Sequence, residues 1–416
     1  MTDGYQPADQ IPKVYLEASK RLARKHDEAA ETHRQIADGN ARFLEPEQFL
    51  KRRVKRLLDN PTVAKQLGRL GVTATVLDAP IDQLGPEAQS GLERVLSGAE
   101  FLPTWFLTRG SELRRTVGRV VARASSGGFP KPGTGFLVAP GVLLTNRHVL
   151  DWSDIGQPGL AEIVPQTVVE FDNEEGLDNL AAPPQARFRL RPDILLLASE
   201  WHDLDYVLVA VESRSLQGDA IGIESLGFNR LTGELGKINK GEPVFIIQHP
   251  RGEPKKVVLR NNLLVSRDEA SNFLTYEANT DRGSSGSPVY NKEWEVVALH
   301  HSVEIARDGN GMVLTRDGGL WTPAMGPENM QLLRMNEGVR VSRILSDLAR
   351  KCDAIAQGAA GALAAHERCN PQGLGMLHAT LRFRLGASPA EIAAPVVPRP
   401  EERPRPSTGR RFPRPE

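Results

Sequence analysis

The sequence predicts a mostly β domain that follows a helical N-terminal region and precedes a tail without a fold. From about residue 112 to 348 the chain consists of short apolar runs separated by Gly, Pro, Asn and Asp, whereas residues 1–108 show a helical pattern and Pro and Arg dominate from residue 389. Short apolar runs rich in β-branched residues and bounded by turn residues are typical of β-sandwiches and β-barrels. No amphipathic helices separate these runs, which argues against a doubly wound α/β fold.

The N-terminal region is expected to be helical. Its first apolar residues recur at a loose helical period among Lys, Arg and Glu; they are Val14, Leu16, Ala18, Leu22 and Ala23. Pro46 stands in the first turn of a second predicted helix, a position that tolerates proline. Residues 90–96, SGLERVL, form another short amphipathic segment. We therefore predict one helical region over residues 1–108.

The rest of the chain divides into three regions. Residues 109–350 form the predicted β domain, which a helical segment over 341–350 closes. Residues 351–388 form an Ala-rich, helix-compatible extension. The tail, residues 389–416, includes the run PRPEERPRP. Such a segment cannot bury enough apolar surface to fold, so we expect a disordered, partly polyproline tail.

The charge balance and the N-terminal residues exclude some partners. The chain has 416 residues with 52 Lys plus Arg and 52 Asp plus Glu, so its formal net charge is zero. No overall field would attract it to nucleic acid or to an anionic membrane. Its first residues, MTDGYQP, lack the basic start and apolar run of a signal peptide, and no stretch reaches the length of a membrane span. We therefore expect a cytoplasmic protein with no nucleic-acid or membrane partner.

The sequence predicts neither a metal nor a cofactor. Two cysteines, Cys352 and Cys369, lie near the C-terminus and are too few for a disulfide framework. There is no cysteine pair at zinc spacing, no His-Glu-x-x-His pattern and no phosphate-binding glycine loop.

The most informative segment is residues 280–290, which read TDRGSSGSPVY. A serine hydroxyl becomes a nucleophile only when a base removes its proton and a donor stabilises the resulting oxyanion. Small residues around the serine would let the N–H groups of Gly283 and Ser285 converge on one point, where each donor contributes about 3 kcal/mol. The alternative is a Gly/Ser-rich hairpin loop without chemistry.

A second segment supplies a candidate base. Residues 133–150 read GTGFLVAPGVLLTNRHVL, a β-hairpin pattern that leads into His148. Imidazole titrates near neutral pH, so it can take the serine proton and return it to a leaving amine. A structural role is the alternative for a lone histidine after a strand.

Together these two segments resemble the chymotrypsin-type serine proteases. The run GSSGSP at 283–288 is similar to their Gly-x-Ser-Gly-x-Pro signature, and the segment before His148 is similar to their Gly-x-Gly-Phe strand and Thr-Ala-x-His motif. The resemblance implies two six-stranded antiparallel β-barrels. It also implies that Ser285, rather than Ser284 or Ser287, is the nucleophile.

In this family the acid lies between the base and the nucleophile in chain order. Residues 202–211 read HDLDYVLVAV, and the family places an aspartate directly before such an apolar strand. Asp205 is the better match because the strand begins at Tyr206, and Asp203 is the alternative. The carboxylate would hold the productive tautomer of His148.

The segment after the nucleophile resembles the staphylococcal-type glutamyl endopeptidases. In that subfamily a threonine and a histidine at the positions of Thr280 and His300 line the specificity pocket and bind an acidic side chain. A hydroxyl and an imidazole can both donate hydrogen bonds to a carboxylate. Asn279 stands where trypsin-like enzymes carry an aspartate for basic substrates, and Arg282 is a further candidate for facing the substrate. A hydrogen-bonded structural histidine is the alternative for His300.

Two further histidines, His249 and His301, are expected to be structural or to lie at the rim of the pocket. Unlike the staphylococcal-type enzymes, which use a free mature N-terminus in acid recognition, this chain has over a hundred residues before the predicted barrel. Ser284 replaces the aspartate that pairs with a freed amine in digestive proteases, and no Ile-Val-Gly-Gly start is present. We therefore expect no activation by that ion pair.

The prediction is a serine endopeptidase that acts on a protein or peptide substrate after acidic residues, as a regulated intracellular bacterial effector. A regulatory protein is expected to bind the N-terminal helical region, which is also a candidate for positioning the substrate or masking the cleft. The alternative is a catalytically silent protease-fold binding module or scaffold.

Overall fold

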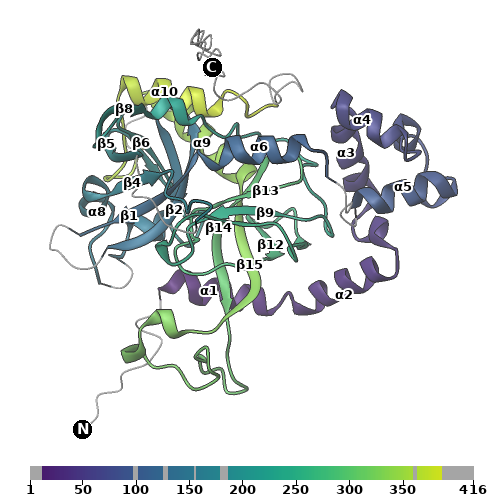
Figure 1. Cartoon of the computed structure of the whole chain (residues 1–416), viewed down its shortest axis with the longest axis horizontal. Helices are drawn as coiled ribbons and strands as arrows, with labels where there is room; N and C mark the ends of the chain where they lie inside the picture. The colour runs from purple at the N-terminus through teal and green to yellow at the C-terminus, as the bar shows by residue number, and fades with distance from the viewer. Residues whose placement is uncertain are drawn as a thin grey trace, which may run out of the picture.

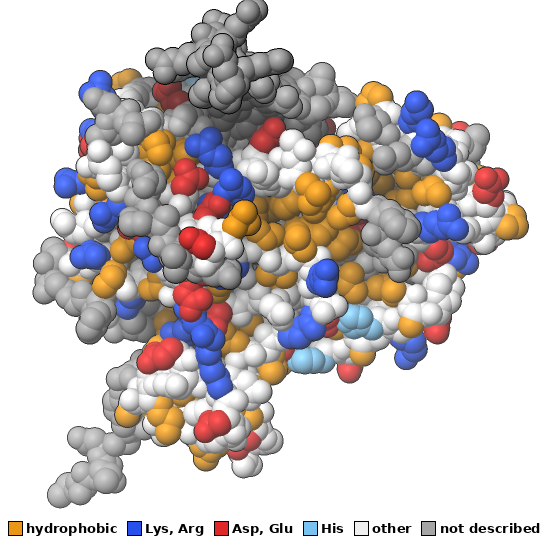
Figure 2. Space-filling model, viewed as in Figure 1, with side chains coloured by type: hydrophobic (Ala, Val, Ile, Leu, Met, Phe, Trp, Pro, Cys, Tyr) orange, Lys and Arg blue, Asp and Glu red, His pale blue; other side chains and the backbone are white. Residues whose placement is uncertain are grey.

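The computed structural model describes residues 12–96, 102–124, 130–153, 156–178, 186–358 and 363–386. Figure 1 shows a group of helices beside two β-sheets, which lie next to each other at the centre of the molecule. The predicted Pro/Arg-rich tail lies outside the described residues. On the face shown in Figure 2, basic and acidic side chains are interspersed and no single charge dominates. No described helix has both the length and the apolar composition needed to cross a membrane.

The N-terminal region is helical, as predicted. Its helices are α1 (Lys13–Ala23), α2 (His26–Ala37), α3 (Glu47–Leu58), α4 (Pro61–Gly68), α5 (Pro86–Leu96) and α6 (Trp105–Arg114). Leu50, Val54 and Leu57 recur at helical spacing on α3, so they share one face. They are buried in a core that α5 completes with Leu92 and Val95.

The first sheet closes into a six-stranded barrel. Its strands are β1 (Val117–Ala122), β2 (Lys131–Ala139), β3 (Val142–Asn146), β4 (Val168–Phe171), β5 (Ala186–Ala198) and β6 (Tyr206–Val211). They pair in the order β5-β4-β1-β2-β3-β6, and a further β5–β6 pairing closes the ring. Two short helices, α7 (Arg147–Leu150) and α8 (Leu160–Gln166), follow β3. The prediction of a six-stranded barrel is confirmed for this half.

The second sheet is a half-barrel, so the prediction of two six-stranded barrels was wrong here. Its strands are β9 (Phe245–Gln248), β10 (Lys256–Val258), β11 (Leu264–Arg267), β12 (Phe273–Glu277), β13 (Pro288–Tyr290), β14 (Val296–Ile305) and β15 (Leu332–Arg340). They pair in the order β10-β9-β13-β14-β15-β12-β11. An isolated bridge between Pro243 and Leu263 is what links the β9 and β11 sides. The bridge is held by the Val244 N–H, which donates to the Asn262 carbonyl at 3.2 Å, and by the Leu264 N–H, which donates to the Glu242 carbonyl at 3.0 Å. Beyond it, β9 pairs with β10 and β13 rather than with β11, so the sheet stays open.

The remaining elements pack around these sheets. They are a hairpin of β7 (Arg214–Ser215) and β8 (Gly218–Gly222), the helices α9 (Val341–Ala356) and α10 (Pro371–Leu381), and β16 (Arg368–Cys369), which pairs with β5. Helix α9 runs through residues 350 and 351, so the predicted closing segment and the start of the Ala-rich extension form one helix. Both cysteines are free thiols.

A buried ion pair joins the helical region to the second sheet. Arg53 of α3 is fully buried and donates to Glu242 from Nε at 2.8 Å and from its terminal nitrogen at 2.7 Å. It also donates to Glu293 at 2.8 Å. The cation is therefore the counter-charge for two carboxylates on the sheet side of the contact.

Replacing this cation should separate a buried interaction from an exposed one. Arg53→Ala is expected to lower the free energy of unfolding by about 3–5 kcal/mol, because two carboxylates lose their buried partner. Arg52→Ala is the matched control on the same helix, since Arg52 is 43% exposed and lies 3.5 Å from Glu269. Arg52→Ala should lower the free energy of unfolding by less than about 1 kcal/mol. Urea unfolding of both variants measures the difference, and equal losses would contradict the proposed role of Arg53.

Candidate active site

The nucleophile loop joins β12 to β13, and two glycines set its shape. Gly283 and Gly286 have φ values of +87° and +88°, a region that side chains rarely adopt. A Cβ on Gly283 would lie 2.6 Å from the carbonyl of His249, and one on Gly286 would lie 2.0 Å from the carbonyl of Thr134. The backbone therefore requires glycine two residues before Ser285 and directly after it, which explains the motif.

Backbone hydrogen bonds hold this loop against both sheets. The N–H of Thr134 donates to the carbonyl of Ser285 at 2.9 Å, and the N–H of Gly286 donates to the carbonyl of His300 at 2.9 Å. Among the described residues, the N–H groups of Gly283 and Ser285 donate to no protein acceptor. These are the two donors that the sequence predicted for the oxyanion.

The ends of two paired strands bring His148 and Asp205 together. His148 follows β3 in α7, Asp205 directly precedes β6, and Asn146 of β3 pairs with Tyr206 of β6. The Nδ1 atom of His148 lies 2.5 Å from Oδ2 of Asp205, and the His148 N–H donates to Oδ1 at 3.0 Å. Asp205 thus orients both the ring and the backbone of His148.

Asp203, the alternative acid, lies elsewhere. Its exposed carboxylate accepts hydrogen bonds from Ser199 at 3.0 Å and from Asn272 at 3.3 Å. Asp205 has φ +41°, and its carbonyl accepts from the Asn146 side chain at 2.9 Å and from the Arg147 N–H at 3.1 Å. The backbone before β6 is therefore fixed so that Asp205, and not Asp203, faces the imidazole.

A second imidazole contacts the same carboxylate. His301 of β14 donates from Nδ1 to Oδ2 of Asp205 at 2.9 Å, and its Nε2 lies 3.4 Å from Oε1 of Glu337. Although burial opposes ionisation, the electrostatic pull of His148 and hydrogen bonds from both imidazoles hold the pKa of Asp205 well below its usual range. Asp205 is therefore a buried anion with imidazole donors from both sheets.

The sequence analysis expected His301 to be structural or to lie at the pocket rim, and it missed this contact. The register of β14 is irregular between His300 and Ser302, so a regular alternation of side chains does not predict which way His301 faces. No local sequence pattern therefore indicated this contact. His249 is structural, as expected: it is fully buried and its Nδ1 donates to the Glu253 carbonyl at 3.0 Å.

Tyr15 of α1 reaches the two catalytic candidates. Its hydroxyl lies 3.4 Å from Nε2 of His148 and 3.4 Å from Oγ of Ser285. Its ring meets the His148 ring edge-on, with the centroids 5.4 Å apart. No direct hydrogen bond joins Ser285 to His148 within the described residues. The structure thus brings Ser285, His148 and Asp205 to one place and adds a tyrosine that no local pattern indicated.

Part of the chain is similar to a known family. Residues 133–299 match a family described as "Trypsin-like peptidase domain". The protein "Uncharacterized protein y4fB" of Sinorhizobium fredii (strain NBRC 101917 / NGR234) is 34% identical over 287 residues. That match covers 64% of this chain and 42% of the relative, so the chain spans less than half of that protein's length.

Solved structures of a mycobacterial protease are also similar to this chain. The active form of Rv3671c protease from M. tuberculosis aligns with a TM-score of 0.36 and 12% identity, over 60% of this chain and 87% of that chain. An inactive form of Rv3671c protease aligns with a TM-score of 0.35 and 13% identity, over 60% and 96% of the two chains.

The predicted specificity residues of the peptidase domain occupy different environments. Asn279 and Thr280 line an open groove beside the nucleophile loop, together with Gln248, Asp281 and Arg260. The Thr280 hydroxyl donates to Oδ1 of Asn336 at 2.5 Å. The partly buried Arg282 has no partner for its Nε among the described residues, and burial lowers its pKa.

His300 lies beneath this surface, only 2% exposed. Its Nδ1 is 2.7 Å from the hydroxyl of Tyr276, which is also buried. Burial, with the neighbouring charges of His301 and His148, lowers the pKa of His300 to about 3. His300 is therefore a neutral imidazole at physiological pH in the free protein.

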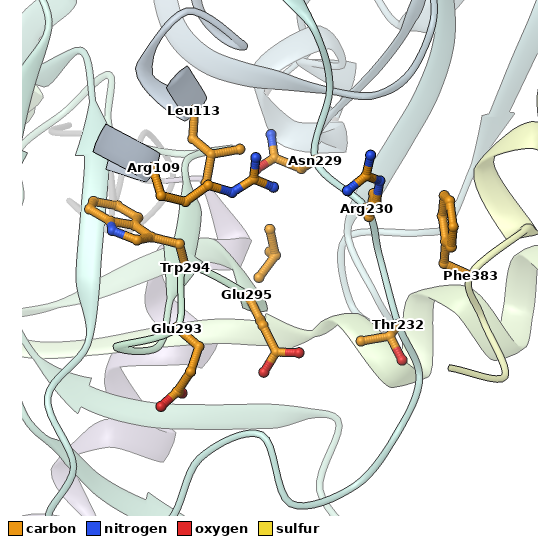
Figure 3. A pocket seen from close by; sticks show the side chains of 10 residues that line it. Arg109, Leu113, Asn229, Arg230, Thr232, Glu293, Trp294, Glu295 and Phe383 are labelled. Atoms are coloured by element: carbon orange, nitrogen blue, oxygen red, sulfur yellow. The ribbon is translucent and has the colours of Figure 1, made fainter. Parts of the chain in front are cut away.

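A second pocket lies apart from these residues, where α6, the start of β14 and Phe383 meet. Figure 3 shows its charged side chains, Arg109, Arg230, Glu293 and Glu295, between Trp294 on one side and Phe383 on the other. Its lining contains none of the predicted catalytic residues, so it is a packing gap between three parts of the fold rather than the active site.

The buried neutral His300 predicts a pH-dependent stability. The unfolded imidazole takes up a proton below about pH 6.5, whereas the folded one stays neutral down to a pKa of about 3, so stability falls as the pH drops through this window. Between pH 7 and pH 4.5, His300→Gln should reduce that loss by about 2 kcal/mol. Urea unfolding at pH 7 and at pH 4.5 measures the loss in the free energy of unfolding for each variant. His202→Gln, at an exposed position, should keep the wild-type loss, and an unchanged loss in His300→Gln would contradict the assignment.

Proposed function

We propose that this protein is a serine endopeptidase in which Ser285 is the nucleophile, His148 the general base and Asp205 the orienting acid. The observation that carries this proposal is the 2.5 Å contact between Nδ1 of His148 and the buried Asp205 carboxylate, beside the Ser285 loop. It supports a tautomer with the proton on Nδ1, which leaves Nε2 as the acceptor for the serine proton.

The chemistry follows from these positions. His148 removes the proton from Ser285 as its Oγ bonds to the scissile carbonyl carbon. The N–H groups of Gly283 and Ser285 would then donate to the oxyanion. His148 returns the proton to the leaving amine as the peptide bond breaks, and water releases the acyl group from Ser285 by the same sequence. Asp205 stabilises the imidazolium throughout, and His301 is a positioning residue that holds Asp205.

Acid and nucleophile variants test this proposal against a silent binding module. Full-length protein should be labelled by a fluorophosphonate probe, and Ser285→Ala should abolish the labelling. Asp205→Asn should slow it by about 10⁴-fold, because the wrong His148 tautomer forms. Asp203→Asn is the matched control and should label at the wild-type rate, since its carboxylate faces Ser199 and Asn272. Labelling that survives Ser285→Ala would refute the serine mechanism.

At the cleaved bond we propose a preference for Glu or Asp. Three features support it: the Thr280 hydroxyl, which would exchange its hydrogen bond to Asn336 for one to the substrate, the unpaired Nε of Arg282, and a neutral His300. When the Tyr276 hydroxyl donates to Nδ1 of His300, the proton lies on Nε2, which can then donate to a carboxylate. Asn279 adds no negative charge that would attract a basic side chain.

A peptide library read by mass spectrometry tests this preference. Glu or Asp should dominate at the cleaved bond, and Thr280→Val should lower kcat/KM for Glu substrates by about 10-fold or more, the loss expected for one hydrogen-bond donor. For cleavage after the next-best neutral residue, kcat/KM of Thr280→Val should stay within about twofold of the wild-type value. Dominance of a basic or a large apolar residue would overturn the proposal.

We further propose a regulated bacterial effector protease that acts on a protein inside the cell. The bacterial relative and the helices packed on the peptidase domain support this role. In this proposal residues 1–108 bind a regulatory protein, residues 109–350 perform the chemistry, and residues 351–388 and 389–416 are accessory segments.

A further inference from the structure

We infer that helix α1 is an autoinhibitory cap, which keeps the peptidase domain inactive until the helix is displaced. This inference rests on the proposed function and adds its regulation. In Figure 1, α1 lies against the long strands β14 and β15, far in sequence from the residues it covers. The helix is 11 residues long, and Tyr15 projects from its first turn to the catalytic residues.

Tyr15 fills the space that the reacting carbonyl needs. For attack, a carbonyl carbon must come within about 3–3.5 Å of the serine oxygen, with the base beside it. The Tyr15 hydroxyl already lies 3.4 Å from both Oγ of Ser285 and Nε2 of His148. While Tyr15 is there, it can exchange hydrogen bonds with both groups, and a substrate carbonyl cannot reach them.

The same helix covers the strand edge that would receive a substrate. β13 pairs with β14 over Val296–Leu299, so beyond His300 that edge has no strand partner in the described part of the chain. The edge begins beside the nucleophile, because the His300 carbonyl accepts from the N–H of Gly286. An extended peptide could add to it by β-augmentation. Instead, the hydroxyl of Ser19 contacts the backbone N and O of Ile305 at 3.3 and 3.5 Å.

Apolar contacts hold α1 in this position. Val14, Ala18 and Leu22 are almost fully buried. Residues 306–331 form an excursion between β14 and β15. Tyr15 and Leu16 pack against a small core that consists of Ile305 and three residues of this excursion, Val313, Trp321 and Met330. The helix is therefore enclosed between the sheet and this excursion.

Charged contacts add a second anchor. Arg21 forms two hydrogen bonds with the Glu337 carboxylate, at 2.9 and 2.7 Å, and its guanidinium lies 4.5 Å from the centre of the Phe273 ring. Glu337 is only 2% exposed and also faces His301, which donates to Asp205. One helix thus contacts the active site twice, through Tyr15 at the nucleophile and through Arg21 behind the acid.

Substitutions that loosen α1 without changing the proposed triad test this cap. We would follow fluorophosphonate labelling of full-length wild type, Tyr15→Ala, Arg21→Glu and Lys20→Glu. Tyr15→Ala empties the space at Ser285, whereas Arg21→Glu places a carboxylate against Glu337. Both should raise the labelling rate by about 10- to 100-fold, as expected when a minor open state becomes the main one. Lys20 is 63% exposed and pairs with Glu17 on the same helix, so Lys20→Glu is the matched charge-reversal control and should label at the wild-type rate.

Two further measurements make the outcome decisive. Ser285→Ala combined with Arg21→Glu must not be labelled, and thermal unfolding of each variant shows that the domain is intact. Ser285-dependent labelling at one rate in wild type, Tyr15→Ala and Arg21→Glu would overturn the cap and leave the proposed function standing. No labelling in any variant would overturn the proposed function, and with it the cap.

Discussion

The Asp205 carboxylate is the constraint on which the rest of the site depends. It is fully buried and ionised, and a buried anion costs several kcal/mol unless donors surround it. Those donors come from two places: His148 from the end of a first-barrel strand, and His301 from β14 of the second sheet. The relative position of the two sheets is therefore tied to the same hydrogen bonds that orient the base.

The features that sequence could predict have local causes. Gly283 and Gly286 stand where a side chain would clash with backbone atoms, so the loop around Ser285 leaves a recognisable pattern. His148 and Asp205 lie at the ends of two apolar strands that pair with each other, and strand ends can be read from composition. For these residues, the local sequence pattern is enough to predict where they lie in the structure.

The features that sequence could not predict depend on contacts between distant segments. His301 carries no local sign that it shares a carboxylate with His148, and Tyr15 lies 133 residues before the imidazole that it contacts. The open second sheet has a similar origin, because the bridge between Pro243 and Leu263 depends on where two remote segments meet. Likewise, the neutral state of His300 follows from its burial beside Tyr276, which the His300 motif alone does not indicate.

Inhibition and stability share their contacts in this molecule. Glu337 is almost fully buried, and Arg21 is the cation from α1 that compensates it. If α1 left, this carboxylate would have to find another cation or a proton, and an uncompensated buried charge is costly. The Nε2 atom of His301 lies 3.4 Å from this carboxylate, and His301 is also a donor to Asp205. Opening the cap therefore perturbs the hydrogen bonds behind the triad as well as the space in front of it, so a displacing partner that brings its own positive charge to Glu337 would open the site at the lowest cost.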